Sequence, residues 1–141
     1  MDTRAAARRW AATWAEAWPA QDVEAIVALQ AEDGTHWASL FRRYDGRAGL
    51  REYVVECFAE EVAPAETWFA EPRVDADSAA VEYWAVMHLA DGPTTLCGCT
   101  VVRFDDSGLV TEARDYSHMK SGRHLPPVPL FESGVGGVPA G

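Results

Sequence analysis

The chain has 141 residues, 48% of them hydrophobic, and a formal net charge of −10. A single domain of this length buries roughly two thirds of the surface that its unfolded chain exposes, so it needs neither a disulfide nor a metal ion to fold. A strongly acidic chain offers no basic stripe to neutralise phosphate groups, which argues against nucleic acid and anionic membranes as partners. A small neutral or cationic molecule fits this charge better.

The amino-terminal segment and the cysteines indicate a reducing compartment. The segment mixes alanine, tryptophan, arginine and glutamate, so it lacks the continuous apolar stretch of a secretory signal. No segment approaches the roughly 18 apolar residues of a membrane helix. Cys57, Cys97 and Cys99 form an odd number without framework spacing, which indicates free thiols. We therefore expect a cytoplasmic protein.

Three helices are predicted in the first part of the chain. Trp10, Trp14 and Trp18 recur every four residues and predict a helix over about 3–18, which ends at Pro19. The second helix is predicted from its N-cap Asp22 to near Gly34. The third follows Gly46 and has the clearest helical spacing. Its apolar face comprises Leu50, Tyr53, Val54, Cys57 and Phe58.

From Pro64 onward the hydrophobic period changes from about 3.6 to 2, and turn clusters divide the sequence into a meander of strands. We expect these strands at about 65–74, 79–89, 94–104 and 109–118. The second has an apolar face, predicted to point into the core, made of Val81, Tyr83, Ala85, Met87 and Leu89. Residues 1–118 are therefore predicted to form one α+β domain, with three N-terminal helices packed on one side of a curved antiparallel sheet. Residues 119–141, rich in proline and glycine, are expected to form a strap or a disordered tail.

Five segments resemble landmarks of the nuclear transport factor 2-like superfamily, in the order in which that superfamily has them. They are QDVEAIVAL, EDGTHWASLF, DGRAGLREYV, AAVEYWA and FDDSGLVTEARDY. The resemblance spans about residues 8–118 and implies a cone-shaped, cystatin-like fold with a hydrophobic pocket. The superfamily includes SnoaL-like polyketide cyclases, limonene epoxide hydrolases, ketosteroid isomerases, dehydratases and binding modules, so the fold alone does not fix the function.

Two mechanisms of that superfamily are incomplete in this sequence. The aspartate base of ketosteroid isomerases corresponds to Ala38, and their oxyanion-hole tyrosine and acid correspond to Trp14 and Thr100. That isomerase mechanism is therefore absent.

The epoxide hydrolase branch has a catalytic aspartate in an RDY motif, which this chain keeps with Asp115 at its centre. The water-binding tyrosine of that branch corresponds to His36. Its partner arginine and second aspartate correspond to Tyr83 and Ala85, so this triad is broken as well.

Asp115 is the main candidate for a catalytic residue. It alternates with Ala113 and Ser117 on one strand face, where an acidic group among small residues is unusual. Burial raises the pKa of a carboxyl group, which would allow proton exchange near neutral pH. The alternative is that Asp115 is a structural hydrogen-bond acceptor.

His36 and Tyr83 are the other catalytic candidates. His36 is predicted on the cavity side of a short strand, where Asp115 would pair with it and set its tautomer for general acid or base chemistry. Tyr83 could donate a hydrogen bond from its phenol O–H to a substrate oxygen. The alternatives are a satisfied core histidine and a packed tyrosine with a local hydrogen bond.

The predicted substrate-binding wall consists of Trp14, Trp18, Phe58, Phe69, Leu96, Thr100 and Ser117, with Phe104 as a further aromatic residue. For most of these side chains, simple core packing is the alternative. The Cys97-Gly98-Cys99 segment lacks the second ligand pair of a closed zinc site, so we expect neither a metal nor a cofactor.

Two functions are compatible with these residues. The first is a cofactor-free acid–base enzyme that carries out cyclisation, isomerisation, dehydration or hydration of a small apolar molecule. The second is a non-catalytic ligand-binding or dimerisation module. In either case we expect a homodimer formed through the outer sheet face, because Trp84 and Val86 lie there among polar residues.

Overall fold

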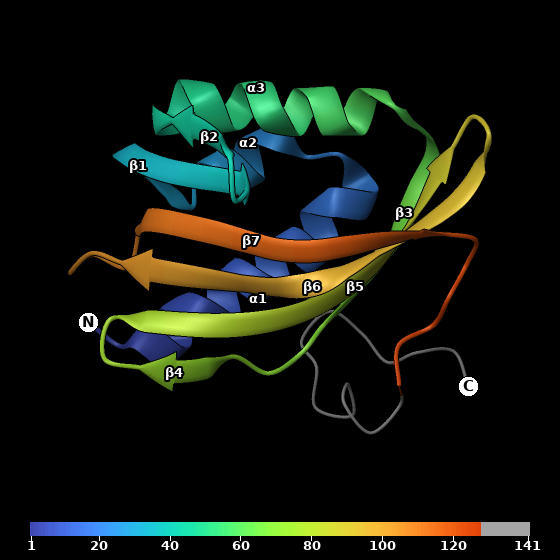
Figure 1. The fold of residues 1–141 in the computed structure, drawn as a ribbon. Helices are drawn as coiled ribbons and strands as arrows, with labels where there is room; N and C mark the ends of the chain where they lie inside the picture. The colour runs from blue at the N-terminus through green and yellow to red at the C-terminus, as the bar shows by residue number, and fades with distance from the viewer. Residues whose placement is uncertain (128–141) are drawn as a thin grey trace.

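The computed structural model describes residues 1–127 and has the predicted α+β fold, a curved sheet packed against three helices (Figure 1). The remaining part of the predicted tail, 128–141, lies outside the described residues. In chain order the elements are α1 (Thr3–Ala20), α2 (Val23–Val27), β1 (Gln30–Ser39), β2 (Arg42–Asp45), α3 (Gly46–Ala59), β3 (Glu61–Phe69), β4 (Arg73–Asp75), β5 (Ser78–Leu89), β6 (Gly92–Phe104) and β7 (Val110–Ser121).

Helix α1 has a cap at each end. The side chain of Asp2 accepts a 3.1 Å hydrogen bond from the Ala5 N–H, and Gln21 adopts a left-handed φ of 54° after the last turn. Pro19 lies inside that last turn, so the helix continues to Ala20 rather than ending at 18.

Helix α2 is much shorter than predicted. Asp22 caps it as expected and accepts a bond from the first turn. The helix ends at Val27 and not near Gly34, because the backbone that follows joins the sheet. The Leu29 carbonyl accepts a 2.8 Å hydrogen bond from the Val110 N–H, so β1 starts directly after it.

The sheet has the strand order β2-β1-β7-β6-β5-β3, with β4 paired to β5 at one end. The meander β5-β6-β7 is antiparallel, as predicted, and β3 pairs antiparallel with β5. Strand β1, however, pairs parallel with β7, so the sheet is mixed rather than wholly antiparallel. Strand β1 precedes the meander in the chain and pairs with the edge of β7 that the meander leaves free. The hydrophobic alternation within the meander strands does not predict this pairing.

The predicted strand 65–74 is two strands in the structure. Strand β3 starts at Glu61 and pairs with β5 as far as Phe69, and β4 then pairs separately with the start of β5. The other strands lie close to their predicted ranges, although β7 continues to Ser121.

The helices lie on the concave side of the sheet. Figure 1 shows β5, β6 and β7 crossing in front of α1, while α3 runs along the top beside β1 and β2. Val81, Tyr83 and Ala85 are buried in the core, as the alternation predicted. Met87 is partly buried against this core, and Leu89 at the end of the strand is only half-buried.

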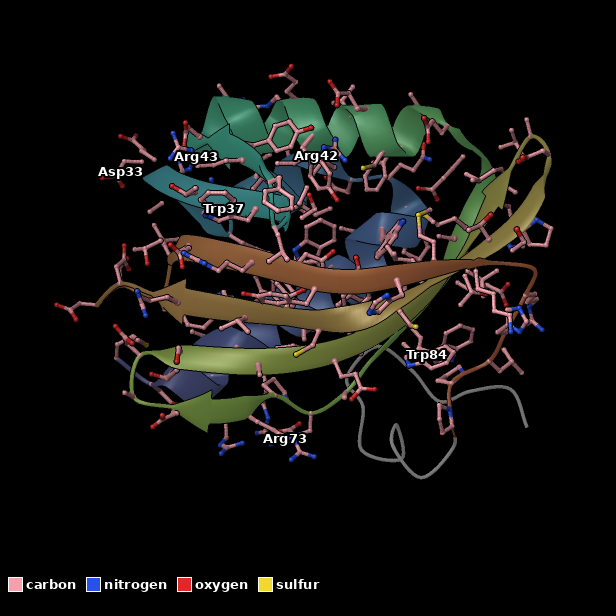
Figure 2. All side chains as sticks on the ribbon, viewed as in Figure 1. Asp33, Trp37, Arg42, Arg43, Arg73 and Trp84 are labelled. Carbon is pink, nitrogen blue, oxygen red and sulfur yellow. The ribbon has the colours of Figure 1, made fainter. Side chains whose placement is uncertain are left out.

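The outer sheet face is partly covered by the chain itself. Val86 is completely buried with Trp68, and Trp84 packs against the same cluster on the face away from α1 (Figure 2). Residues 122–127 have no regular structure, and Arg123 is held to Glu66 by two short hydrogen bonds of 2.7 and 3.0 Å.

Residues 1–127 contain no disulfide, and all three cysteines are free thiols. In the same part of the chain, no cluster of three or more His, Cys, Asp or Glu side chains could hold a metal ion. None of its helices has the length and hydropathy needed to cross a membrane.

Candidate functional site

The sheet, α1 and α3 enclose a cavity of about 80 Å³. Because one water needs roughly 10–15 Å³ by this measure, the space is equivalent to about five to eight waters or a small organic group. The tryptophan side chains of α1 therefore line this cavity without filling it. The sequence-predicted residues that line it are Trp14, Trp18, His36, Phe58, Phe69, Tyr83, Leu96, Thr100 and Asp115.

Asp115 is held by three hydroxyl groups from three neighbouring strands. Its Oδ1 accepts a 2.7 Å hydrogen bond from the Tyr83 phenol on β5 and a 3.3 Å bond from the Thr100 hydroxyl on β6. Its Oδ2 accepts a 2.8 Å bond from the Ser117 hydroxyl on β7. Ser117 is not part of the cavity wall and contacts the site through this bond.

Strand register explains how these hydroxyls meet. Thr100 lies directly opposite Asp115, and Gly98 lies opposite both Tyr83 and Ser117. A Cβ atom at Gly98 would overlap the Tyr116 carbonyl oxygen and would be 2.8 Å from the Ser117 Cβ. The absence of a side chain at Gly98 therefore lets β6 pair closely with β7 beside the Tyr83–Asp115 hydrogen bond. Sequence reasoning missed this residue, although a glycine inside a strand is a signal of close backbone approach.

Burial changes the proton affinity of both members of this hydrogen bond. It raises the pKa of Asp115 above that of an ordinary aspartate, while the bonds from Tyr83, Ser117 and Thr100 act in the opposite direction. Burial, together with the nearby Asp115 charge, also raises the pKa of Tyr83. The phenol therefore stays protonated and donates, and the carboxyl group is the one that can exchange a proton.

His36 lines the same cavity but does not bond to Asp115. Its side chain is only 6% exposed, and burial lowers its pKa to about 4, so the imidazole is neutral at neutral pH. No hydrogen bond or ion pair joins His36 to Asp115 among the described contacts, so the predicted direct pair is wrong. The register places His36 opposite Ala113, and hydroxyl groups occupy both oxygens of Asp115. The His36 ring instead packs on Tyr53, with 4.9 Å between ring centroids.

Five aromatic side chains form a closed belt around one side of the cavity. The centroid distances are 6.1 Å for Trp10–Trp14, 6.0 Å for Trp14–Trp18, 6.3 Å for Trp18–Tyr83, 5.5 Å for Tyr83–Phe69 and 6.1 Å for Phe69–Trp10. Each ring thus contacts the next, and the last contacts the first. We call these five residues the aromatic belt.

Some wall residues were missed, and one predicted wall residue lies elsewhere. Those missed are Trp10, Tyr53, Val54, Cys57 and Met87. Four of them continue the predicted helical stripes of α1 and α3, and Met87 alternates with Tyr83, so the signals were present in the spacing. Phe104 is buried in the core and does not line the cavity.

Comparison with known proteins identifies the family. The sequence profile of the SnoaL-like domain matches residues 7–113. The chain belongs to the SnoaL-like domain family. This membership confirms the predicted place within the nuclear transport factor 2-like superfamily. A comparison with curated protein sequences finds no match.

Solved structures share the fold of this SnoaL-like chain. The epoxide hydrolase/cyclase-like enzyme SalBIII, which has a role in pyran ring formation in the polyether salinomycin, superposes with a TM-score of 0.72 at 19% identity, over 86% of this chain and 100% of that one. A hypothetical protein with a ketosteroid isomerase-like fold from Catenulispora acidiphila, solved in complex with trimethylamine, superposes with a TM-score of 0.65 at 21% identity, over 74% of this chain and 81% of that one. At these identities the likeness establishes the fold and leaves the reaction open.

Proposed function

We propose that this SnoaL-like protein is a cofactor-free acid–base enzyme acting on a small apolar molecule, by cyclisation, isomerisation, dehydration or hydrolysis. The observation that supports it is the Asp115 carboxyl group, which lies in the wall of an aromatic cavity with a pKa raised by burial. The epoxide hydrolase/cyclase-like character of SalBIII is in keeping with this class of chemistry.

The geometry leaves one oxygen of Asp115 able to react. A carboxylate has about four lone-pair sites, and three hydroxyl donors use three of them. Oδ1 accepts from Tyr83 and Thr100, whereas Oδ2 accepts only from Ser117. Oδ2 is therefore the atom that we expect to take a proton from a substrate or return one, while Tyr83 fixes the orientation of the carboxyl group.

His36 supplies a second proton-handling group in the same cavity. Because its imidazole is neutral at neutral pH, one ring nitrogen can donate and the other can accept. The lack of a direct bond to Asp115 leaves both groups available to a ligand between them. We infer that Asp115 and His36 act on the two ends of one substrate, one as acid and the other as base.

A non-catalytic binding module is the second candidate function. It is favoured by the three hydroxyl bonds themselves, since they give Asp115 the environment of a satisfied structural acceptor. In this case the cavity would bind an apolar ligand without transforming it.

We also infer that the protein is cytoplasmic and forms a homodimer. Three unpaired cysteines suit a reducing compartment. The outer face of the sheet carries exposed apolar side chains on β6 and β7, Val101 at 40% and Tyr116 at 43% exposure, which suit contact with a second copy.

The test is turnover of small epoxides and β-hydroxyketones, followed by NMR, with wild type and Asp115→Asn. Loss of a general acid or base lowers kcat by about 10²–10⁴-fold, and we expect a loss of this size. Asp106→Asn, in the exposed turn before β7, is the matched control and should keep full activity. Turnover that persists in Asp115→Asn would refute the role of Asp115. Ligand binding by wild type without turnover of any compound would support the binding module.

A further inference from the structure

The aromatic belt makes up a large part of the cavity wall. Three of its five rings are indoles, and all five residues line the cavity. The face of an aromatic ring attracts cations, with tryptophan the strongest of the side chains. An apolar ligand would need only hydrophobic surface, whereas a closed circuit of rings built mainly from tryptophan also suits a positive charge.

The ionisable groups of the cavity wall add negative charge and no compensating positive charge. Within residues 1–127 the wall includes one acidic side chain, Asp115, and neither lysine nor arginine. His36 contributes no charge at neutral pH. Buried carboxylates are normally paired with a cation, but in the described part of the chain Asp115 has only hydroxyl partners.

A second carboxylate bonds to the belt from outside the cavity wall. The Trp18 indole N–H donates a 3.2 Å hydrogen bond to Oε2 of Glu61, and the Tyr83 phenol donates to Asp115. Two of the five rings therefore donate hydrogen bonds to carboxyl groups, which increases the electron density of their π systems. Oε1 of Glu61 is buried and has no hydrogen-bond partner among the described residues, and burial raises the pKa of this carboxyl group.

We propose that the cavity binds a small organic cation, a protonated tertiary amine or a quaternary ammonium group, in contact with the aromatic belt and with its charge balanced by Asp115. The volume of about 80 Å³ suits a group the size of trimethylammonium. This inference names the ligand class of the site described under the proposed function and rests on it for the location of that site. It does not require turnover.

The test uses two probes of the same shape and different charge. Choline carries a trimethylammonium group, and 3,3-dimethyl-1-butanol carries a neutral tert-butyl group in its place. Binding is measured by calorimetry and by NMR shifts of the indole N–H signals. We expect choline to bind at least about 10-fold more tightly than the alcohol, because a desolvated cation–π contact strengthens binding to this extent.

Two variants assign this preference to the proposed groups. Asp115→Asn should remove most of the preference for choline while leaving the affinity for the alcohol unchanged, and Trp14→Leu should reduce the preference without removing the carboxylate. Asp106→Asn is the control and should behave like wild type. Retained tryptophan fluorescence and a cooperative unfolding transition show that each variant is folded.

The outcomes separate this inference from the proposed function. Equal binding of the two probes, or an unchanged preference in Asp115→Asn, overturns the cation site and leaves an acid–base enzyme for neutral substrates. Failure of both probes to bind also overturns it. If a hydrophobic dye then fails to enter the cavity as well, the proposed function fails with it.

Discussion

The Tyr83 phenol on β5 donates a 2.7 Å hydrogen bond to Oδ1 of Asp115 on β7, reaching across β6. Strands β5 and β7 are not neighbours in the sheet, because β6 lies between them. Gly98 of β6 lies opposite both Tyr83 and Ser117, and its lack of a side chain lets β6 pair closely with β7 beside this bond. This contact fixes the orientation of the carboxyl group that we propose to act on the substrate.

The first prediction concerns Tyr83→Phe, which removes the donor and keeps the ring. Because the hydrogen bond from Tyr83 lowers the pKa of Asp115, its loss should raise that pKa further. Loss of a bond to a charged group should also lower the free energy of unfolding by about 1.5–3 kcal/mol. An NMR titration of the Asp115 carboxyl carbon and urea denaturation measure the two effects. Tyr116→Phe, at an exposed position, is the control and should change neither quantity. An unchanged pKa of Asp115 in Tyr83→Phe would contradict the hydrogen bond between Tyr83 and Asp115.

A second prediction follows from the burial of His36. Its pKa is about 4 in the folded protein against 6.5 in the unfolded chain, so the unfolded state takes up a proton first as the pH falls. The stability due to the neutral imidazole is complete above pH 6.5 and is lost as the pH falls towards 4. The difference between the two values corresponds to roughly 3 kcal/mol.

Urea denaturation at several pH values between 7 and 4 measures this effect. His36→Gln should lose less stability than wild type over that interval, because it cannot take up the proton. His118→Gln, on the exposed part of β7, is the matched control and should follow wild type. If the free energy of unfolding of wild type and of His36→Gln changed with pH in parallel, the buried imidazole would not be the source of the pH dependence.

The sequence predicts the wall of the cavity better than its centre. The four-residue spacing of the α1 tryptophans and the alternation around Tyr83 are local signals, so they predicted Trp14, Trp18 and Tyr83 in the wall. The Tyr83–Asp115 bond depends on the register of β5, β6 and β7, which is a relation between distant segments and has no local period. The early end of α2 has the same cause, since the backbone of Leu29 bonds to Val110 far along the chain.

A third prediction is that Gly98→Ala destabilises the fold and disturbs the site. Its Cβ would overlap the backbone oxygen of Tyr116, which cannot rotate away, so β6 and β7 must separate. Overpacking of this kind costs about 1–3 kcal/mol. Urea denaturation should show this loss, and the NMR-measured pKa of Asp115 should also change. Wild-type stability in this variant would mean that the strands tolerate a side chain here.

The fourth prediction places the homodimer contact on β6 and β7 rather than at Val86. Val86 is completely buried within one chain, whereas Val101 is 40% exposed on the outer face. Light scattering at tens of micromolar should report a dimer for wild type and a monomer for Val101→Arg. Val55→Arg, at a 49% exposed site on α3, is the control and should remain dimeric. A wild-type monomer at that concentration would refute the dimer.

The last prediction concerns the contribution of Asp115 to stability, first as a function of pH and then at neutral pH, where it separates a catalytic role from a structural one. Burial raises the pKa of Asp115 in the folded protein, so the unfolded chain loses this proton at lower pH than the folded one. The stability contributed by the protonated form is therefore present below the ordinary pKa of aspartate and is lost as the pH rises through the folded pKa. Relative to Asp115→Asn, wild type should become less stable over this interval.

At neutral pH, Asp115→Asn should change the free energy of unfolding by no more than about 1–2 kcal/mol. The asparagine oxygen can still accept from Tyr83 and Thr100, its amide can donate to the Ser117 hydroxyl, and a desolvated charge is removed. A catalytic role then requires that turnover is lost while the fold persists. A much larger loss of stability with intact binding of a hydrophobic probe would instead identify Asp115 as a structural acceptor, because its carboxylate would then be required by the sheet and not by the ligand.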